Sequence, residues 1–138
     1  MAIKAVLDSN IWISAIIKGK MADLLGIAVT YDVEFIRCKE LSDEIRKVLG
    51  IKKFEQYLTE PVSHYVSVFE SATTTVRIRH EFSGCLDPKD NYLFDLAIQT
   101  KAKYIVSGDR DVCETLVGKP VEIVTLAKFK ERLKQSLN

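Results

Sequence analysis

Carboxylate side chains recur in this sequence directly after apolar runs that have the character of buried strands. Asp8 follows the run Ile3–Leu7, and Asp109 follows the run Tyr104–Ser107 after one glycine. Asp90 lies at the start of a long apolar stretch that leads into the second run. Parallel strands of one open α/β sheet end at the same edge, where ligands bind. The spacing therefore predicts that these acids lie near one crevice.

A fourth acid, Glu44, lies in a helical stretch that follows another strand-like run. Each acid taken alone also has a structural explanation. Asp8, Asp90 and Asp109 could cap helices or favour their amino termini, and Glu44 could pair with a neighbouring lysine such as Lys39. Capping explains less well why acids recur beside one edge of the sheet.

Converging carboxylates repel one another unless a cation lies between them. Two unit charges about 4 Å apart repel by roughly 1 kcal/mol even in bulk water, and by more near a protein surface. Oxygen donors without cysteine or histidine suit Mg²⁺ or Mn²⁺. Such ions bind phosphate oxygens and lower the pKa of bound water. The acids therefore suggest metal-assisted hydrolysis of a phosphodiester.

The elements that must position these acids alternate in type along the chain, which implies βαβ units and a parallel sheet. The predicted strands are Ile3–Leu7, Glu34–Cys38, Thr75–Ile78, Tyr104–Ser107 and Val121–Val124. The predicted helices are Asn10–Ile17, Met21–Val29, Lys39–Leu49, Lys52–Leu58, Val62–Thr73, Pro88–Lys101 after an Asp87 cap, a short helix that begins near Val112, and Leu126–Leu137. We expect a single α/β domain over residues 1–138.

Composition narrows the class of protein. A chain of 138 residues can form one domain with a sizeable core, and a net charge of +1 indicates no general attraction to nucleic acid. Any such attraction must come from local patches or metal ions. Three cysteines without CxxC spacing argue against a disulfide framework and a zinc site. With no signal-peptide pattern and no run of membrane-spanning length, we expect a cytoplasmic protein.

Four stretches of the sequence together resemble the PIN-domain ribonucleases. They are VLDSNIWISA (6–15), ELSDEIRKVL (40–49), DPKDNYLFDLAIQTKAKYIVSGDRD (87–111) and VEIVTLAKFKERL (121–133), in the family's order. The similarity is greatest to the prokaryotic toxins of toxin–antitoxin pairs. It implies a three-layer α/β/α fold around a mostly parallel, five-stranded sheet. It also implies cleavage of single-stranded RNA with one or two Mg²⁺ or Mn²⁺ ions.

The resemblance also assigns roles to particular residues. The family's four catalytic, metal-binding acids match Asp8, Glu44, Asp90 and Asp109. Asn10 and Ser107 match polar positions that line the site. We expect Asn10 to orient the first acid, and Ser107 to form a hydrogen bond to an acid or to a water molecule on the metal.

Some further residues have two interpretations. Asp111 matches an extra acid of many family members, so it is either a fifth metal ligand or a helix cap. Arg110, beside the fourth acid, is the basic residue that we expect to contact RNA phosphate. Trp12 could stack on a base, but a core position or a dimer contact is the more usual role. His64 and His80 lack ligand spacing and are expected at the surface.

Two other functions are compatible with acids at a sheet edge. A phospho-acceptor receiver domain needs an aspartate after its third strand, and TVRIRHEF has none there. A PIN module that binds RNA or a protein without cleavage stays open, although the full set of acids argues against it. By resemblance, the expected partners are a cognate antitoxin and a second copy of the chain, which would pack through the first helices and residues 62–73.

Overall fold

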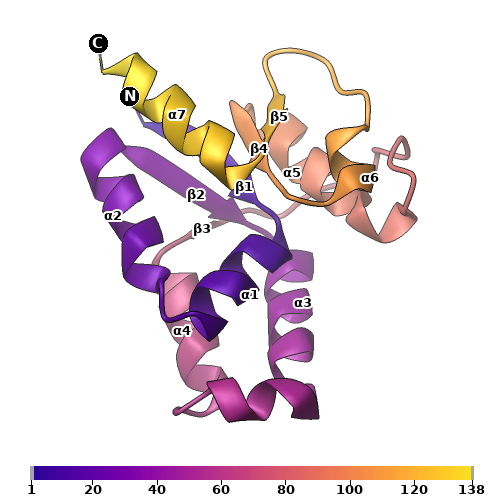
Figure 1. The fold of residues 1–138 in the computed structure, drawn as a ribbon. Coiled ribbons are helices and arrows are strands. Elements are labelled where there is room, and N and C mark those ends of the chain that lie inside the picture. Colours follow the sequence, from indigo (N-terminus) through magenta and orange to yellow (C-terminus); the bar gives the residue numbers. More distant parts are fainter. Residues whose placement is uncertain (1, 138) are drawn as a thin grey trace.

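The computed structural model describes residues 2–137, and Figure 1 shows helices on both faces of one sheet. Within this range the strands are β1 (Ile3–Leu7), β2 (Val33–Arg37), β3 (Thr74–Thr75), β4 (Tyr104–Val106) and β5 (Glu122–Val124). Their order in the sheet is β3-β2-β1-β4-β5, and every pairing is parallel. The predicted α/β/α fold with a mostly parallel, five-stranded sheet is confirmed.

Helices connect the strands and cover the sheet. The described helices are α1 (Ser9–Ile17), α2 (Met21–Tyr31), α3 (Lys39–Leu49), η1 (Lys52–Tyr57), α4 (Val62–Ser71), η2 (Pro88–Asp90), α5 (Asn91–Thr100), α6 (Arg110–Cys113) and α7 (Leu126–Ser136). In Figure 1, α7 crosses in front of the sheet and α5 lies behind it. Helix α3 packs against both α1 and α4. Among residues 2–137, no helix is long and apolar enough to cross a membrane.

The order of the strands reverses between β1 and β4. From β1 the chain adds β2 and β3 on one side, and it then returns to add β4 and β5 on the other. Such a switch point leaves a crevice beyond the carboxyl ends of the two neighbouring strands. Because Leu7 pairs with Val106, the next residues, Asp8 and Ser107, are brought side by side. A receiver domain is excluded, since its strands run 2-1-3-4-5.

The core explains why the strands are apolar without alternation. Residues 5–7 of β1 are fully buried because helices cover both faces of the sheet. Trp12 of α1 is also fully buried. Its ring lies edge to face with Phe35 of β2 and Phe69 of α4, at centroid distances of 5.3 and 5.0 Å. Trp12 is therefore a core residue and neither a base-stacking surface nor a dimer contact.

Two predicted elements are replaced by shorter ones. The strand predicted at Thr75–Ile78 is found only as the two-residue β3, and the side chain of Gln99 on α5 then holds the chain at Arg79. The helix predicted at Lys52–Leu58 is the 3-10 helix η1. None of its residues is buried, so it lacks the apolar face that stabilises an α-helix by packing.

Two predicted helices begin differently in the structure. The helix expected from Pro88 starts as η2 and becomes α5 only at Asn91. Asp87 caps η2 as predicted, since its side chain accepts a hydrogen bond from Lys89 N at 3.2 Å. Helix α6 begins at Arg110, two residues before the predicted start.

Candidate active site

Asp8 follows β1 and is almost fully buried at the switch point. Its backbone N–H donates to Val106 O at 2.9 Å, which fixes the end of β1 against β4. Its carboxylate makes no capping hydrogen bond to α1. The hydroxyl of Ser107 donates instead to Asp8 Oδ2 at 2.7 Å, and that of Ser9 donates to Oδ1 at 3.3 Å. The main hydrogen-bond partners of the Asp8 carboxylate are therefore these hydroxyls and not the helix that it precedes.

The environment of Asp8 contains opposing electrostatic effects. Burial raises the pKa of Asp8 above its usual value, because it disfavours the charged carboxylate. The hydrogen bond from Ser107 and the backbone of Asn10 lower this pKa, and the negative charge of Glu44 raises it. Asn10 acts here through its backbone, since its exposed side chain makes no hydrogen bond within residues 2–137.

Ser107 connects two of the predicted acids. Its Oγ donates to Asp8 and accepts a hydrogen bond from the backbone N–H of Asp109 at 3.0 Å. Asp109 also caps α6, because its Oδ1 accepts from Asp111 N at 2.8 Å. The capping interpretation of Asp111 is therefore wrong: this residue lies half-buried in the first turn of α6.

Asp90 lies at the junction of η2 and α5 with its carboxylate buried. Asp90 lies in the first turn of η2, as the dipole explanation expects, but its side chain makes no capping bond to α5. Its Oδ2 atom has no hydrogen-bond partner among the described residues. A buried polar atom without a partner costs on the order of 1–3 kcal/mol, so such an atom needs an explanation.

The pKa of Asp90 depends on the charges of the other predicted acids. Burial is the largest cause that raises the pKa of Asp90 to about 6. The next causes are the negative charges of its neighbours, in the order Asp8, Asp109, Asp87 and Glu44. Like charges raise one another's pKa only at short range. The four predicted acids, which are distant in sequence, therefore lie near enough to influence one another's charge, without forming a compact cluster.

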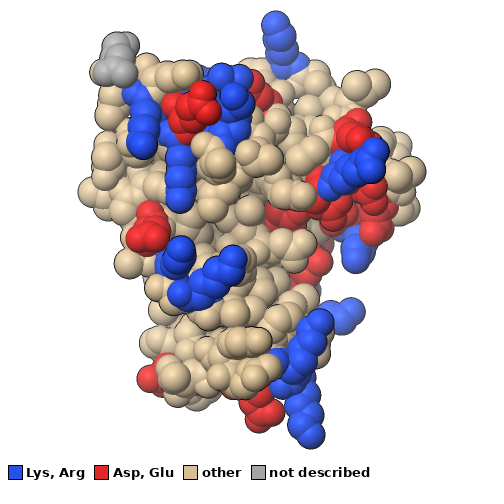
Figure 2. All heavy atoms as spheres, in the orientation of Figure 1, with Lys and Arg blue, Asp and Glu red and all other residues tan. Residues whose placement is uncertain are grey.

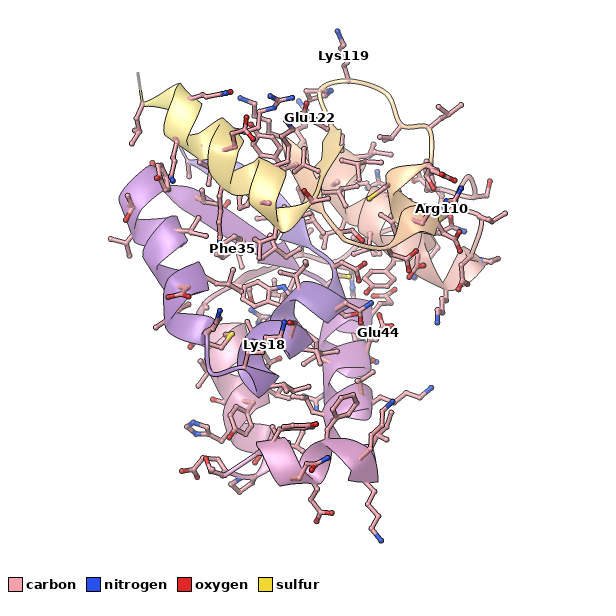
Figure 3. All side chains as sticks on the ribbon, in the orientation of Figure 1. Lys18, Phe35, Glu44, Arg110, Lys119 and Glu122 are labelled. Carbon is pink, nitrogen blue, oxygen red and sulfur yellow. The ribbon has the colours of Figure 1, made fainter. Side chains whose placement is uncertain are left out.

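Glu44 lies half-buried on α3, and Figure 3 shows it near the end of that helix closest to the sheet. It does not pair with Lys39, which bonds to Asp43 at 2.5 Å. The hydroxyl of Tyr92, on α5, donates instead to Glu44 Oε2 at 2.8 Å. The explanation of Glu44 as a solvated partner of a lysine is therefore wrong.

Two groups near the acids were not identified from the sequence. The pKa of Tyr92 lies far above its usual value, chiefly because of burial and the charge of Glu44, so its hydroxyl stays protonated and donates. The thiol of Cys113 lies 3.4 Å from Ser107 O, and burial and the charges of Asp109 and Asp8 raise its pKa. A tyrosine within an apolar helix could have indicated such a contact, since a buried hydroxyl needs a hydrogen-bond partner.

Arg110 lies at the outer edge of this region. In Figure 3 it projects from α6, and its side chain is 86% exposed and bonded to Glu114 at 2.9 Å. Exposed ion pairs of this kind contribute about 0–1 kcal/mol, so Arg110 can exchange Glu114 for another anion. Figure 2 shows acidic side chains gathered on this side of the molecule, around α6 and the nearby end of α3.

The donor set fits a hard divalent cation, although the acids do not form a ready-made cluster. The predicted ligands are all carboxylates, which suit Mg²⁺ or Mn²⁺. Within residues 2–137, no three acidic, histidine or cysteine side chains lie close enough together to hold an ion. The partnerless Oδ2 of Asp90 and the mutual repulsion of the acids are nevertheless what a cation would satisfy.

A groove of about 620 Å³ lies apart from these acids. Its lining includes Arg37, Lys39, Asp43, Arg46, Arg77 and His80. None of the four predicted acids lines it, and its charges are largely paired within the protein, for example Lys39 and Arg46 with Asp43. We therefore place the candidate site at the switch point and not in this groove.

Comparison with known proteins agrees with the fold. Residues 4–111 match the family model of the PIN domain, and the chain belongs to this family. An uncharacterized protein of Methanocaldococcus jannaschii, MJ1680, is 31% identical over 121 residues, which cover 80% of this chain and 73% of the relative. PIN domains are in general nucleases that use divalent metal ions.

A solved structure shares the fold. It is the crystal structure of VapBC2 from Rickettsia felis bound to a DNA fragment from their promoter. One chain matches with a TM-score of 0.62 over 88% of this chain and 98% of that chain, at 14% sequence identity. At this identity, the likeness shows that the two chains share a fold.

Proposed function

We propose that this chain is a divalent-metal-dependent endoribonuclease that cleaves single-stranded RNA. The observation that carries the proposal is the buried Oδ2 of Asp90, which has no partner and lies in the field of Asp8 and Asp109. One or two bound Mg²⁺ or Mn²⁺ ions would balance these charges, polarise a phosphate and lower the pKa of bound water. Membership of the PIN-domain family supports nuclease chemistry.

The contacts of each residue suggest its part in the proposed reaction. Asp8 and Asp109 are held relative to each other through Ser107, so they form the fixed side of the proposed metal site. Asp90, at the junction of η2 and α5, and Glu44, on α3, complete it.

Two neighbouring residues have proposed roles at its rim. Asp111 is proposed as a further ligand, because Asp109 caps α6 and the Asp111 carboxylate does not. Arg110 is proposed to bind an RNA phosphate in place of Glu114, its partner in the free protein.

Cleavage of a labelled single-stranded RNA with Mg²⁺ or Mn²⁺ tests the proposal. Wild type should cleave, and Asp8→Asn and Asp109→Asn should each reduce the rate by a factor of 100 or more, on the order expected for groups that hold a catalytic ion. The matched control is Asp95→Asn, which alters a buried aspartate outside the site and should keep the activity. Equal cleavage by wild type and both site variants would refute the proposal.

A non-catalytic PIN module that binds RNA or a protein is the second candidate. It is favoured by the absence of a ready-made three-residue metal cluster within residues 2–137. Isothermal titration with Mn²⁺ separates the two candidates. Binding that is lost in Asp8→Asn and Asp90→Asn supports the nuclease, whereas no binding by wild type supports the module.

We further propose that the nuclease is the toxin of a type II toxin–antitoxin pair and acts in the cytoplasm. Support comes from the sequence resemblance and from the fold that the chain shares with part of VapBC2, a toxin–antitoxin complex. A small reading frame just upstream, with a DNA-binding amino-terminal half, should encode the antitoxin. Expression of the chain alone should arrest growth, and co-expression of that frame should restore it. Arrest that persists on co-expression would contradict this pairing.

A homodimer is also proposed, with contacts through α1, α2 and the region of α4. Size-exclusion chromatography with light scattering should return twice the chain mass of 15.6 kDa. A monomer at all accessible concentrations would show that this part of the family resemblance does not hold for the chain.

A further inference from the structure

Helix α5 places a phenol where its neighbours are apolar. Tyr92 is 7% exposed, and the residues beside it, Leu93 and Phe94, are fully buried. A buried phenol normally finds a hydrogen-bond partner. The partner of Tyr92 is Glu44 Oε2, at 2.8 Å and 48 positions away along the chain. This bond joins α3, which carries Glu44, to α5, which begins directly after Asp90.

The hydrogen bond from Tyr92 uses Oε2 of the Glu44 carboxylate and leaves Oε1 without a protein partner among the described residues. Oε1 of Glu44 makes no hydrogen bond to any residue within 2–137. Glu44 has several rotatable bonds, and its charge repels those of Asp8 and Asp90. Without a donor on the protein side, this repulsion would favour rotation of the carboxylate toward solvent. The Tyr92 hydroxyl opposes that rotation.

We propose that Tyr92 is a positioning residue that holds the Glu44 carboxylate toward Asp8 and Asp90, with Oε1 free to bind the metal. The inference rests on the proposed metal-dependent function. Groups that orient metal-binding carboxylates from behind change metal affinity about 10- to 100-fold when they are removed. Tyr92 contributes to the site through Glu44 and not by contact with substrate.

A purely structural role for Tyr92 leads to a different result. If the hydroxyl only completes the packing of α5 against α3, its removal lowers the stability of the protein and leaves metal affinity unchanged. Metal affinity is therefore the deciding measurement, with stability measured beside it.

Isothermal titration of Mn²⁺ into Tyr92→Phe, without RNA, tests the proposal. The substitution keeps the ring and removes only the hydroxyl, so we expect Mn²⁺ to bind about tenfold more weakly. The matched control is Tyr104→Phe. Tyr104 is equally buried and packs edge to face on Phe129 at 5.3 Å, at the other end of β4 from the acids. This control should bind Mn²⁺ as wild type does.

A double-variant cycle shows whether the effect passes through Glu44. In a Glu44→Gln background, Tyr92→Phe should cause no further loss of Mn²⁺ affinity. An equal loss in both backgrounds, or wild-type affinity in Tyr92→Phe, overturns the positioning role and leaves the proposed function standing. Failure of wild type to bind Mn²⁺ overturns both.

If Tyr92→Phe does not fold, tyrosine absorption of the wild-type protein provides a second test. Mn²⁺ should perturb the near-ultraviolet tyrosine absorption of wild type, because it withdraws charge from the acceptor of the Tyr92 hydroxyl. The perturbation should persist in Tyr104→Phe and vanish in Glu44→Gln. Mn²⁺ binding by wild type without any tyrosine signal contradicts the proposal on its own.

Discussion

Asp90 is the residue at which burial and charge act most strongly together. Its pKa is raised from an ordinary 3.8 to about 6, first by burial and then by the neighbouring acids. The folded, metal-free protein therefore holds this proton more tightly than the unfolded chain does. The resulting stabilisation is fully present below about pH 4 and is lost as the pH rises through about 6. Its size is on the order of 2–3 kcal/mol.

Asp90→Asn should remove this pH dependence in the metal-free protein. In the presence of a chelator, we expect the variant to unfold at pH 7.5 with a free energy about 1–2 kcal/mol above that of wild type, because an uncharged amide replaces a buried anion. The two proteins should differ little near pH 4. Urea titrations at both pH values measure the difference, with Asp95→Asn as a buried-acid control. A variant less stable than wild type at pH 7.5 would show that the Asp90 charge is not unfavourable.

Ser107 controls the charge state of the first acid, which can be tested through the pH dependence of cleavage. Ser107→Ala removes the donor to Asp8 Oδ2 and leaves burial to act on that carboxylate. The pKa of Asp8 should rise further, so the acidic limb of the rate profile should move to higher pH. We expect the rate to fall more at the acidic end of the profile than at pH 8. A uniform loss at all pH values would assign Ser107 a structural role alone.

At the scale of elements, α5 does more than follow Asp90 and carry Tyr92. Its buried Asp95 accepts hydrogen bonds from the backbone N–H groups of Glu81 and Phe82, at 3.1 and 2.8 Å. Gln99 exchanges two hydrogen bonds with the backbone of Arg79. The segment that leaves β3 is therefore held by side chains of a helix, beyond the end of the strand that the sequence pattern predicted at Thr75–Ile78.

Asp95→Ala should release this segment. Two backbone N–H groups lose their acceptor, so the free energy of unfolding should fall by about 1–3 kcal/mol. Asp95→Asn keeps an acceptor oxygen and should cost less. Limited proteolysis should cut the alanine variant between β3 and η2 faster than the asparagine variant. Equal cutting of both variants would mean that other contacts hold the segment.

At the scale of the whole molecule, the switch point holds buried, negatively charged side chains next to a core that is mostly apolar. A cation that binds the folded site, and not the unfolded chain, stabilises the fold by about 2.7 kcal/mol at 100 times its Kd. Mn²⁺ should therefore raise the Tm of wild type by about 9 °C for a chain of this size.

The control for this thermal shift is the same measurement on Asp8→Asn. It should show little or no increase in Tm with Mn²⁺, while Asp95→Asn should respond as wild type does. A similar increase in all three proteins would place the bound ion outside the candidate site. Calcium at the same concentration distinguishes a site that prefers smaller ions from general screening of acidic charge.

The sequence by itself determined the fold class and the order of the acids. Strands covered on both faces must be apolar without alternation, and helices must carry an apolar stripe, so residues 3–7 and Lys39–Leu49 are recognisable from local pattern. The family motifs also located Asp8 and Asp109 at strand ends from local sequence. A turn from a strand into a helix is a local event with local residue preferences.

Only the tertiary structure decided how these residues are used. It showed that Asp109 and not Asp111 caps α6, and that Asp90 lacks a hydrogen-bond partner. It also joined Tyr92 to Glu44 across 48 positions of the chain. Burial, charge–charge repulsion and long-range hydrogen bonds depend on distances in space. These distances arise when the chain returns from β3 to pair β4 with β1, and spacing along the sequence does not contain them.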